Sequence, residues 1–82
     1  MKVAVDISLY PLDADFIPPI KDVIERLNSH EDLEIWTNAM STQIVGEFGV
    51  VMDALKAEIG TTFEQVPKGV FVMKILNNPL FG

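Results

Sequence analysis

The chain has 82 residues, a hydrophobic share of 49%, a formal net charge of −6 at pH 7 and no cysteine. This length allows one domain, residues 1–82, with one small core, and the apolar share is that of a globular protein. An acidic surface repels phosphate backbones, so nucleic acid is not an expected partner, whereas the charge does not exclude small neutral or cationic ligands. The lack of cysteine excludes disulfides and thiolate metal sites and fits a reducing cytoplasm.

The start of the chain predicts neither export nor membrane insertion. Its only apolar run contains Asp6 and is followed by no small-residue cleavage site, and no run elsewhere is long enough to span a bilayer. A core from a chain barely longer than roughly 70 to 80 residues supplies only a few kcal/mol. We therefore expect a cytoplasmic protein that gains stability by self-association into a dimer or tetramer.

The first half of the chain predicts a strand and a helix. Apolar residues alternate with polar or small ones in the strand, which Pro11 ends: Val3, Val5, Ile7 and Leu9. Asp13 or Asp15 is expected to mark the start of the helix, whose first turn takes Pro18 and Pro19. Apolar residues then recur at helical spacing until about residues 29–30, with the charged residues, Arg26 among them, largely on the solvent side: Ile20, Val23, Ile24 and Leu27.

The second half predicts a hairpin, a helix and a last strand. Alternation over residues 33–40 indicates one strand, and residues 43–46 begin the next after a tight link. Apolar residues from Phe48 to Ile59 have helical spacing, and Gly60 is placed to end that helix. Residues 70–76 are apolar on both faces. The order βαββαβ most simply folds as an α+β, ferredoxin-like sandwich, in which an antiparallel four-stranded sheet carries two helices on one face.

This architecture leaves one face of the sheet uncovered, and the alternation predicts which side chains lie on it: Asp6, Ser8, Tyr10, Trp36, Asn38, Met40, Val70, Val72 and Lys74. A face that carries Trp, Tyr, Met and Val is too apolar to stay in water, so we expect it to pack on the sheet of another subunit. Polar groups on it would then be desolvated. A small planar ligand is held in such a setting by stacking and a few directed hydrogen bonds.

Hydroxyl and amide side chains interrupt the apolar pattern where the two middle strands meet: Asn38, Ser41, Thr42 and Gln43. Buried polar groups need partners, which are backbone, water or a ligand. Two interpretations follow. The residues form an ordinary polar turn, because Ser, Thr and Asn are common turn residues, or they form a ligand site.

The sequence resembles the YkoF-like thiamine/hydroxymethylpyrimidine-binding family over most of its length. The resemblance rests on a strand ending in Ser8-Leu9-Tyr10-Pro11-Leu12, the run Met40-Ser41-Thr42-Gln43, the following Gly46-Glu47, and a helix with Val51-Met52-Asp53-Ala54-Leu55. It implies a ferredoxin-like domain that pairs through its sheet, binds the aminopyrimidine of thiamine or its precursor, and has no established chemistry. The chain departs from the family pattern in its short connection to the last strand and in its tail, residues 77–82, both expected near the closure of a binding cleft.

The residue types fit that ligand. An aminopyrimidine presents ring-nitrogen acceptors beside an amine donor, and the planar amides of Asn38 and Gln43 match that edge. Hydroxyls add single hydrogen bonds, aromatic rings add a stacking surface, and carboxylates add a counter-charge for the thiazolium cation: Ser41 and Thr42, Trp36 or Tyr10, and Asp6 or Glu47.

Several of these residues also have a structural interpretation. Trp36 is a suitable interface anchor, Glu47 suits a helix start, and Asp6 is placed to pair with Lys74 across the sheet. His30 is expected to be a solvated residue at a helix end rather than a metal ligand or a base.

Catalytic motifs are missing from the sequence. It has no cysteine nucleophile, no histidine placed with Ser and Asp, no glycine-rich phosphate loop and no recognisable metal-ligand spacing, and the sole arginine, Arg26, lies mid-helix. We therefore expect no enzyme and no cofactor or metal. The expected function is binding of thiamine or hydroxymethylpyrimidine near a subunit interface. The alternative is a ligand-free regulatory or interaction module, which is favoured if the polar cluster satisfies itself.

Overall fold

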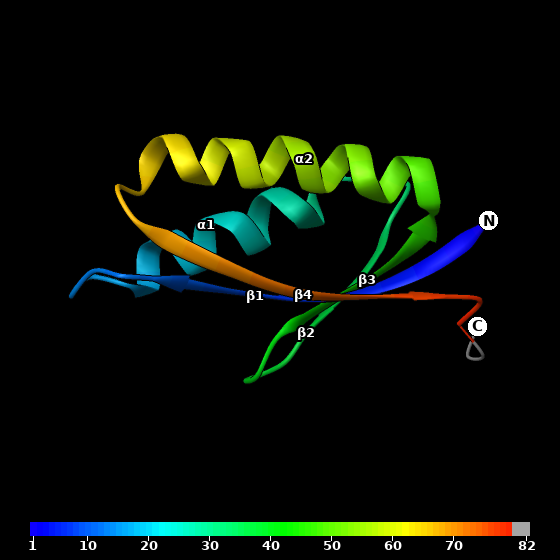
Figure 1. Cartoon of the computed structure of the whole chain (residues 1–82), viewed down its shortest axis with the longest axis horizontal. Helices are drawn as coiled ribbons and strands as arrows, with labels where there is room; N and C mark the ends of the chain where they lie inside the picture. The colour runs from blue at the N-terminus through cyan, green and yellow to red at the C-terminus, as the bar shows by residue number, and fades with distance from the viewer. Residues whose placement is uncertain (80–82) are drawn as a thin grey trace.

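Two helices lie on one face of a four-stranded sheet in the computed structural model, which describes residues 1–79 (Figure 1). The strands are β1 (Lys2–Pro11), β2 (Glu34–Thr37), β3 (Thr42–Glu47) and β4 (Gly69–Asn77), and the helices are α1 (Ile17–Asn28) and α2 (Phe48–Gln65). The strand order is β2-β3-β1-β4, and all neighbouring strands are antiparallel. The predicted ferredoxin-like sandwich is confirmed. Residues 80–82 of the tail lie outside the described part of the chain.

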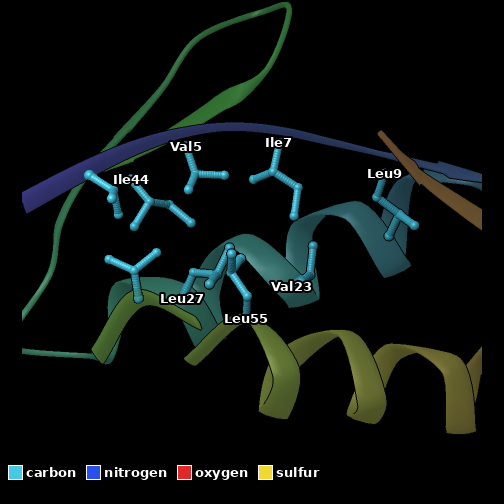
Figure 2. Close-up of a cluster of buried hydrophobic side chains, with 9 residues drawn as sticks. Val5, Ile7, Leu9, Val23, Leu27, Ile44 and Leu55 are labelled. Atoms are coloured by element: carbon cyan, nitrogen blue, oxygen red, sulfur yellow. The ribbon is translucent and has the colours of Figure 1, made fainter. Parts of the chain in front are cut away.

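The core lies between the central strand β1 and the two helices. Every second residue of β1 is buried, because alternate side chains of a strand point to the same face: Val3, Val5, Ile7 and Leu9. Figure 2 shows the last three of these side chains pointing towards Val23 and Leu27 of α1 and Leu55 of α2. The predicted apolar faces of β1 and of both helices therefore form one cluster.

The start of α1 differs from the prediction. Pro18 and Pro19 do occupy its first turn, but the N-cap is Phe16, and no side chain caps the helix. Instead of capping, Asp13 accepts a hydrogen bond on Oδ1 from the backbone N–H of Asp15 at 3.1 Å and shapes the preceding loop. The helix ends at Asn28, as expected from the pattern, with Ser29 as its C-cap.

The predicted end of α2 at Gly60 is wrong, because the helix continues to Gln65. Gly60 is exposed, and its lack of a side chain costs the helix only about 1 kcal/mol. Thr62 and Val66, beyond it, are buried. Their tertiary contacts outweigh the weak helix preference of glycine.

The prediction for the hairpin is also wrong in detail. β2 ends at Thr37 rather than near Met40, and residues 38–41 form the turn. Asn38 makes this turn: its Oδ1 accepts hydrogen bonds from the N–H groups of Met40 (2.8 Å) and Ser41 (3.0 Å), and its own N–H donates to the Ser41 carbonyl. Asn38 and Met40 thus lie at the hairpin tip and not within a strand on the open face.

Arg26 and His30, expected in solvent, instead join the two helices. The Arg26 guanidinium donates to Glu58 Oε1 at 2.6 Å and to Thr62 Oγ1 at 2.8 Å on α2, and to Asp22 Oδ2 on its own helix. His30 Nε2 lies 2.7 Å from Glu58 Oε2. Burial of the Glu58 carboxyl raises its pKa, but the hydrogen bonds and charges of His30 and Arg26 outweigh burial and hold the pKa below its ordinary value.

Candidate ligand-binding site

A cavity lies where β1 extends beyond its neighbour β3. β1 pairs with β3 only as far as Ile7, whose partner is Thr42, while its pairing with β4 continues to Pro11. The β2–β3 hairpin tip leaves the plane of β1 on the side away from α2 (Figure 1). The end of β1 therefore has no strand beside it on one edge. A cavity of about 480 Å³ occupies this place, between the end of β1, the hairpin turn and α1.

The walls of this cavity are mostly apolar, with a small number of neutral polar groups. α1 supplies Ile20, Val23, Ile24 and Leu27, and the mouth carries the exposed side chains of Leu12, Phe16 and Met40. The polar groups come from β1 and the hairpin: Ser8, Tyr10, Thr37, Asn38, Ser41 and Thr42. Cavities of this size and character are typical of small-molecule sites.

The polar groups are only partly satisfied by the protein. Thr42 is 5% exposed and its hydroxyl lies 3.1 Å from that of Thr37, while Ser8 Oγ donates to the Met40 carbonyl at 3.3 Å. Asn38 uses its side-chain oxygen in the turn. Its amide nitrogen and the hydroxyls of Ser41 and Tyr10 have no hydrogen-bond partner within residues 1–79. Donors and acceptors thus remain at the edge of an apolar space.

The structure brings half of the predicted site residues together. Tyr10, Asn38, Ser41 and Thr42 all line the cavity. The other four do not line it. Glu47 lies at the N-terminus of α2, where its carboxylate accepts a hydrogen bond from the N–H of Val50 at 3.1 Å, the structural role that the sequence also suggested.

The remaining three predicted residues, Asp6, Trp36 and Gln43, lie in one row across the open sheet face. Trp36 is the cross-strand partner of Gln43, Gln43 of Asp6, and Asp6 of Lys74. Asp6, Gln43 and Lys74 line a second hollow of about 170 Å³. Asp6 Oδ1 is buried there without a hydrogen-bond partner in the described part of the chain, and no ion pair joins Asp6 to Lys74, although the expected register is present.

The sequence did not indicate the wall supplied by α1, nor Ser8 and Thr37 as cavity residues. Its alternation placed the site on the open sheet face, whereas the cavity is also lined by α1 and by the helix-facing residues Ile7 and Leu9 of β1. One signal was available: the first predicted strand is longer than the third, so part of it had to lack a neighbour. Similarly, the tail was expected near the cleft, but Asn77 pairs with Val3, at the opposite end of β1 from the cavity.

The model of the thiamine-binding protein family matches residues 5–79 of the chain. The chain belongs to this family. No helix within residues 1–79 is both long and apolar enough to cross a membrane, and no group of three or more metal-binding side chains gathers there. No curated protein sequence matches the chain.

Solved structures share the fold of this family member. A candidate thiamine biosynthesis/salvage protein from Thermotoga maritima is 24% identical with a TM-score of 0.86, over 95% of this chain and 85% of that one. A Streptococcus pneumoniae protein is 24% identical with a TM-score of 0.89, over 98% and 90%. A hypothetical protein from Methanocaldococcus jannascii is 28% identical with a TM-score of 0.82, over 99% and 84%.

Proposed function

We propose that this protein is a non-catalytic binding protein for thiamine or its hydroxymethylpyrimidine part, and that the pyrimidine ring enters the cavity between β1, α1 and the hairpin. Membership of the thiamine-binding protein family supports the class of ligand. One observation carries the location: a cavity of about 480 Å³ combines apolar walls with hydrogen-bonding groups that have no protein partner among the described residues.

The groups at the cavity suit an aminopyrimidine. A flat ring packs against the apolar side chains of α1, such as Ile24, as small-molecule sites usually provide. The Asn38 amide nitrogen donates to a ring nitrogen, because its oxygen is already used by the turn. The hydroxyls of Ser41 and Thr42 accept from the exocyclic amine. The site therefore needs neither a metal nor a charged side chain to orient this ring.

Two adjacent residues on opposite faces of β3 provide the test. Thr42 lines the cavity and Gln43 lies on the open face. Thr42→Val keeps the shape but removes the hydroxyl, so it should weaken binding of hydroxymethylpyrimidine roughly tenfold, because a lost hydrogen bond in a dry site costs about 1 to 3 kcal/mol. Gln43→Ala should bind as the parent does. Titration calorimetry measures both, with circular dichroism as the check on folding.

The outcomes of this titration separate the two function classes. If Gln43→Ala loses affinity and Thr42→Val does not, the ligand occupies the open face, and the cavity assignment is wrong. If the parent binds neither thiamine nor hydroxymethylpyrimidine at millimolar concentration, the interaction-module function replaces the binding function.

We also propose that the open sheet face packs on the same face of a second copy. Large apolar side chains lie exposed on it: Trp36, Val70, Val72 and Leu76. The Asp6 carboxylate, whose Oδ1 has no hydrogen-bond partner within residues 1–79, and the neighbouring Lys74 carry opposite charges on this face. In a two-fold interface, where the same patch is used by both subunits, Asp6 of each copy can face Lys74 of the other. Such pairing would cover the apolar surface and provide the missing partner for Asp6.

A further inference from the structure

The side chains that line the cavity carry no charge. Among the described residues that form its wall, the polar groups are hydroxyls and one amide, and the rest are apolar. An anion inside this cavity would lose its hydration without gaining a cation in return, which is costly. Proteins that bind phosphate usually provide Arg, Lys or a helix N-terminus for it.

The N-terminus of α1 lies at the cavity but lacks the groups that would bind phosphate there. Its N-cap residue Phe16 is part of the cavity wall. Pro18 and Pro19 occupy the first turn, and proline has no backbone N–H. A helix start normally offers several free N–H groups to an anion, and this start has lost two of them.

Two carboxylates lie on the segment that connects two residues of the cavity wall. Asp13 and Asp15 are exposed on the short segment between Leu12 and Phe16, both of which line the cavity. Lys68 is close in the fold, because its carbonyl accepts a hydrogen bond from Leu12 N–H, but it does not line the cavity. The chain as a whole carries a net charge of −6. These two carboxylates and the acidic net charge favour a cation such as thiazolium at the mouth over an anion.

We propose that the cavity accepts pyrimidine ligands in their unphosphorylated form, neutral or cationic, and rejects their phosphate esters. This inference rests on the proposed function and adds which chemical form of the ligand the site selects. A phosphate monoester carries about −1.5 to −2 charges near neutral pH, and it would meet an uncharged wall, a proline-blocked helix start and two carboxylates.

Titration calorimetry with four ligands tests this proposal: hydroxymethylpyrimidine, its monophosphate, thiamine and thiamine monophosphate, at about 0.15 M salt to limit long-range effects. Each phosphate ester should bind at least roughly tenfold more weakly than its parent alcohol. If the esters bind as tightly as the alcohols, the proposed selectivity against phosphate esters is wrong, while the proposed binding function stands. If none of the four binds at millimolar concentration, both proposals fail together.

A new cation at the mouth provides a second test. Met40 is 84% exposed and lines the cavity, so Met40→Lys places a positive charge there without disturbing the core. Ala57→Lys on the exposed side of α2, a helix that does not line the cavity, changes the net charge equally and serves as the control. Met40→Lys should reduce the ratio of alcohol affinity to ester affinity at least roughly threefold. Ala57→Lys should leave this ratio unchanged. An equal effect of both variants would overturn the local explanation.

Discussion

The side chains of Thr42 and Gln43 point to opposite faces of the sheet, and this direction decides which of the two surfaces each residue belongs to. Both are polar and adjacent in β3, but Thr42 is buried at the cavity and Gln43 lies on the open face beside Asp6. Asn38 combines two roles, because its oxygen holds the turn while its amide nitrogen remains free of protein partners within residues 1–79. The sequence could identify these residues as a polar cluster, but it could not assign them to two different faces without the strand ends.

Also at the scale of single residues, the contacts of Glu58 predict that the stability of the protein depends on pH. Its side chain is 13% exposed, and its pKa is held below the ordinary value of 4.5. A carboxyl whose pKa is lower in the folded state adds stability above the pKa of the unfolded chain, and this stability is lost as the pH falls through the folded value. We expect the free energy of unfolding to drop as the pH is lowered from 4.5 through that lowered pKa.

Urea unfolding over this pH range checks the expectation. Glu58→Gln cannot ionise, so the drop in its free energy of unfolding should be smaller than that of the parent. Glu64→Gln, on the exposed surface of α2, is the control and should retain the parent's pH dependence. An identical pH profile for the parent and Glu58→Gln would show that the contacts with Arg26 and His30 do not stabilise the charged form.

At the scale of elements, the apolar pattern predicted the type and order of the six helices and strands within residues 1–79. In β1 and the two helices the pattern marks one buried face, whereas β4 was predicted from a run that is apolar on both faces. The pattern failed at boundaries that are set by tertiary contacts. α2 continues past Gly60 because Thr62 and Val66 are buried, and β2 stops early because the Asn38 side chain forms the turn. The Arg26 contacts with α2 were equally hidden, since helical spacing does not reveal which residues of another helix lie opposite.

The extension of α2 through Gly60 predicts that Gly60→Ala stabilises the protein. A Cβ at this position would meet no described atom within 4 Å beyond its chain neighbours and the adjacent helix backbone, so the substitution gains helix propensity without a tertiary clash. The free energy of unfolding should rise by about 0.5 to 1 kcal/mol in urea titrations. Gly46→Ala should instead lower the free energy of unfolding, because its Cβ would lie 2.9 Å from Leu33 Cδ2 and 3.1 Å from Val51 Cγ2. A loss of stability in Gly60→Ala would contradict the observed course of the helix.

At the scale of the whole molecule, the cavity and the row of Asp6, Trp36 and Gln43 on the open face use different surfaces, although Ser8 and Tyr10 of the open face reach the cavity. The cavity lies between α1 and the end of β1, and the open face is the side of the sheet opposite the helices (Figure 1). The sequence suggested a single site in which the ligand lies at the subunit interface, because it could not show that the hairpin leaves β1 after Ile7. Binding and assembly are consequently expected to respond to different substitutions.

The exposed position of Trp36 predicts how self-association responds to the removal of its side chain. It is 48% exposed on the open face, and its removal should weaken self-association by roughly 2 kcal/mol if it lies at the centre of the interface. Sedimentation equilibrium of Trp36→Ala measures this change. Phe63→Ala removes a comparably exposed aromatic side chain from α2 and should assemble as the parent does. A parent protein that remains a folded monomer at micromolar concentration would refute the proposed pairing.

The location of the ligand is the central claim, and methyl-detected NMR during a titration with hydroxymethylpyrimidine tests it most directly. The reporting methyl groups lie on two separate surfaces. Ile20 and Ile24 of α1 line the cavity, and Val45 of β3 and Leu76 of β4 line the second hollow on the open face, beside Ala4 and away from the cavity. We expect the signals of the two isoleucines to shift with added ligand while those of Val45 and Leu76 stay in place. Shifts confined to Val45 and Leu76, or no shifts at millimolar ligand, would contradict binding in the cavity.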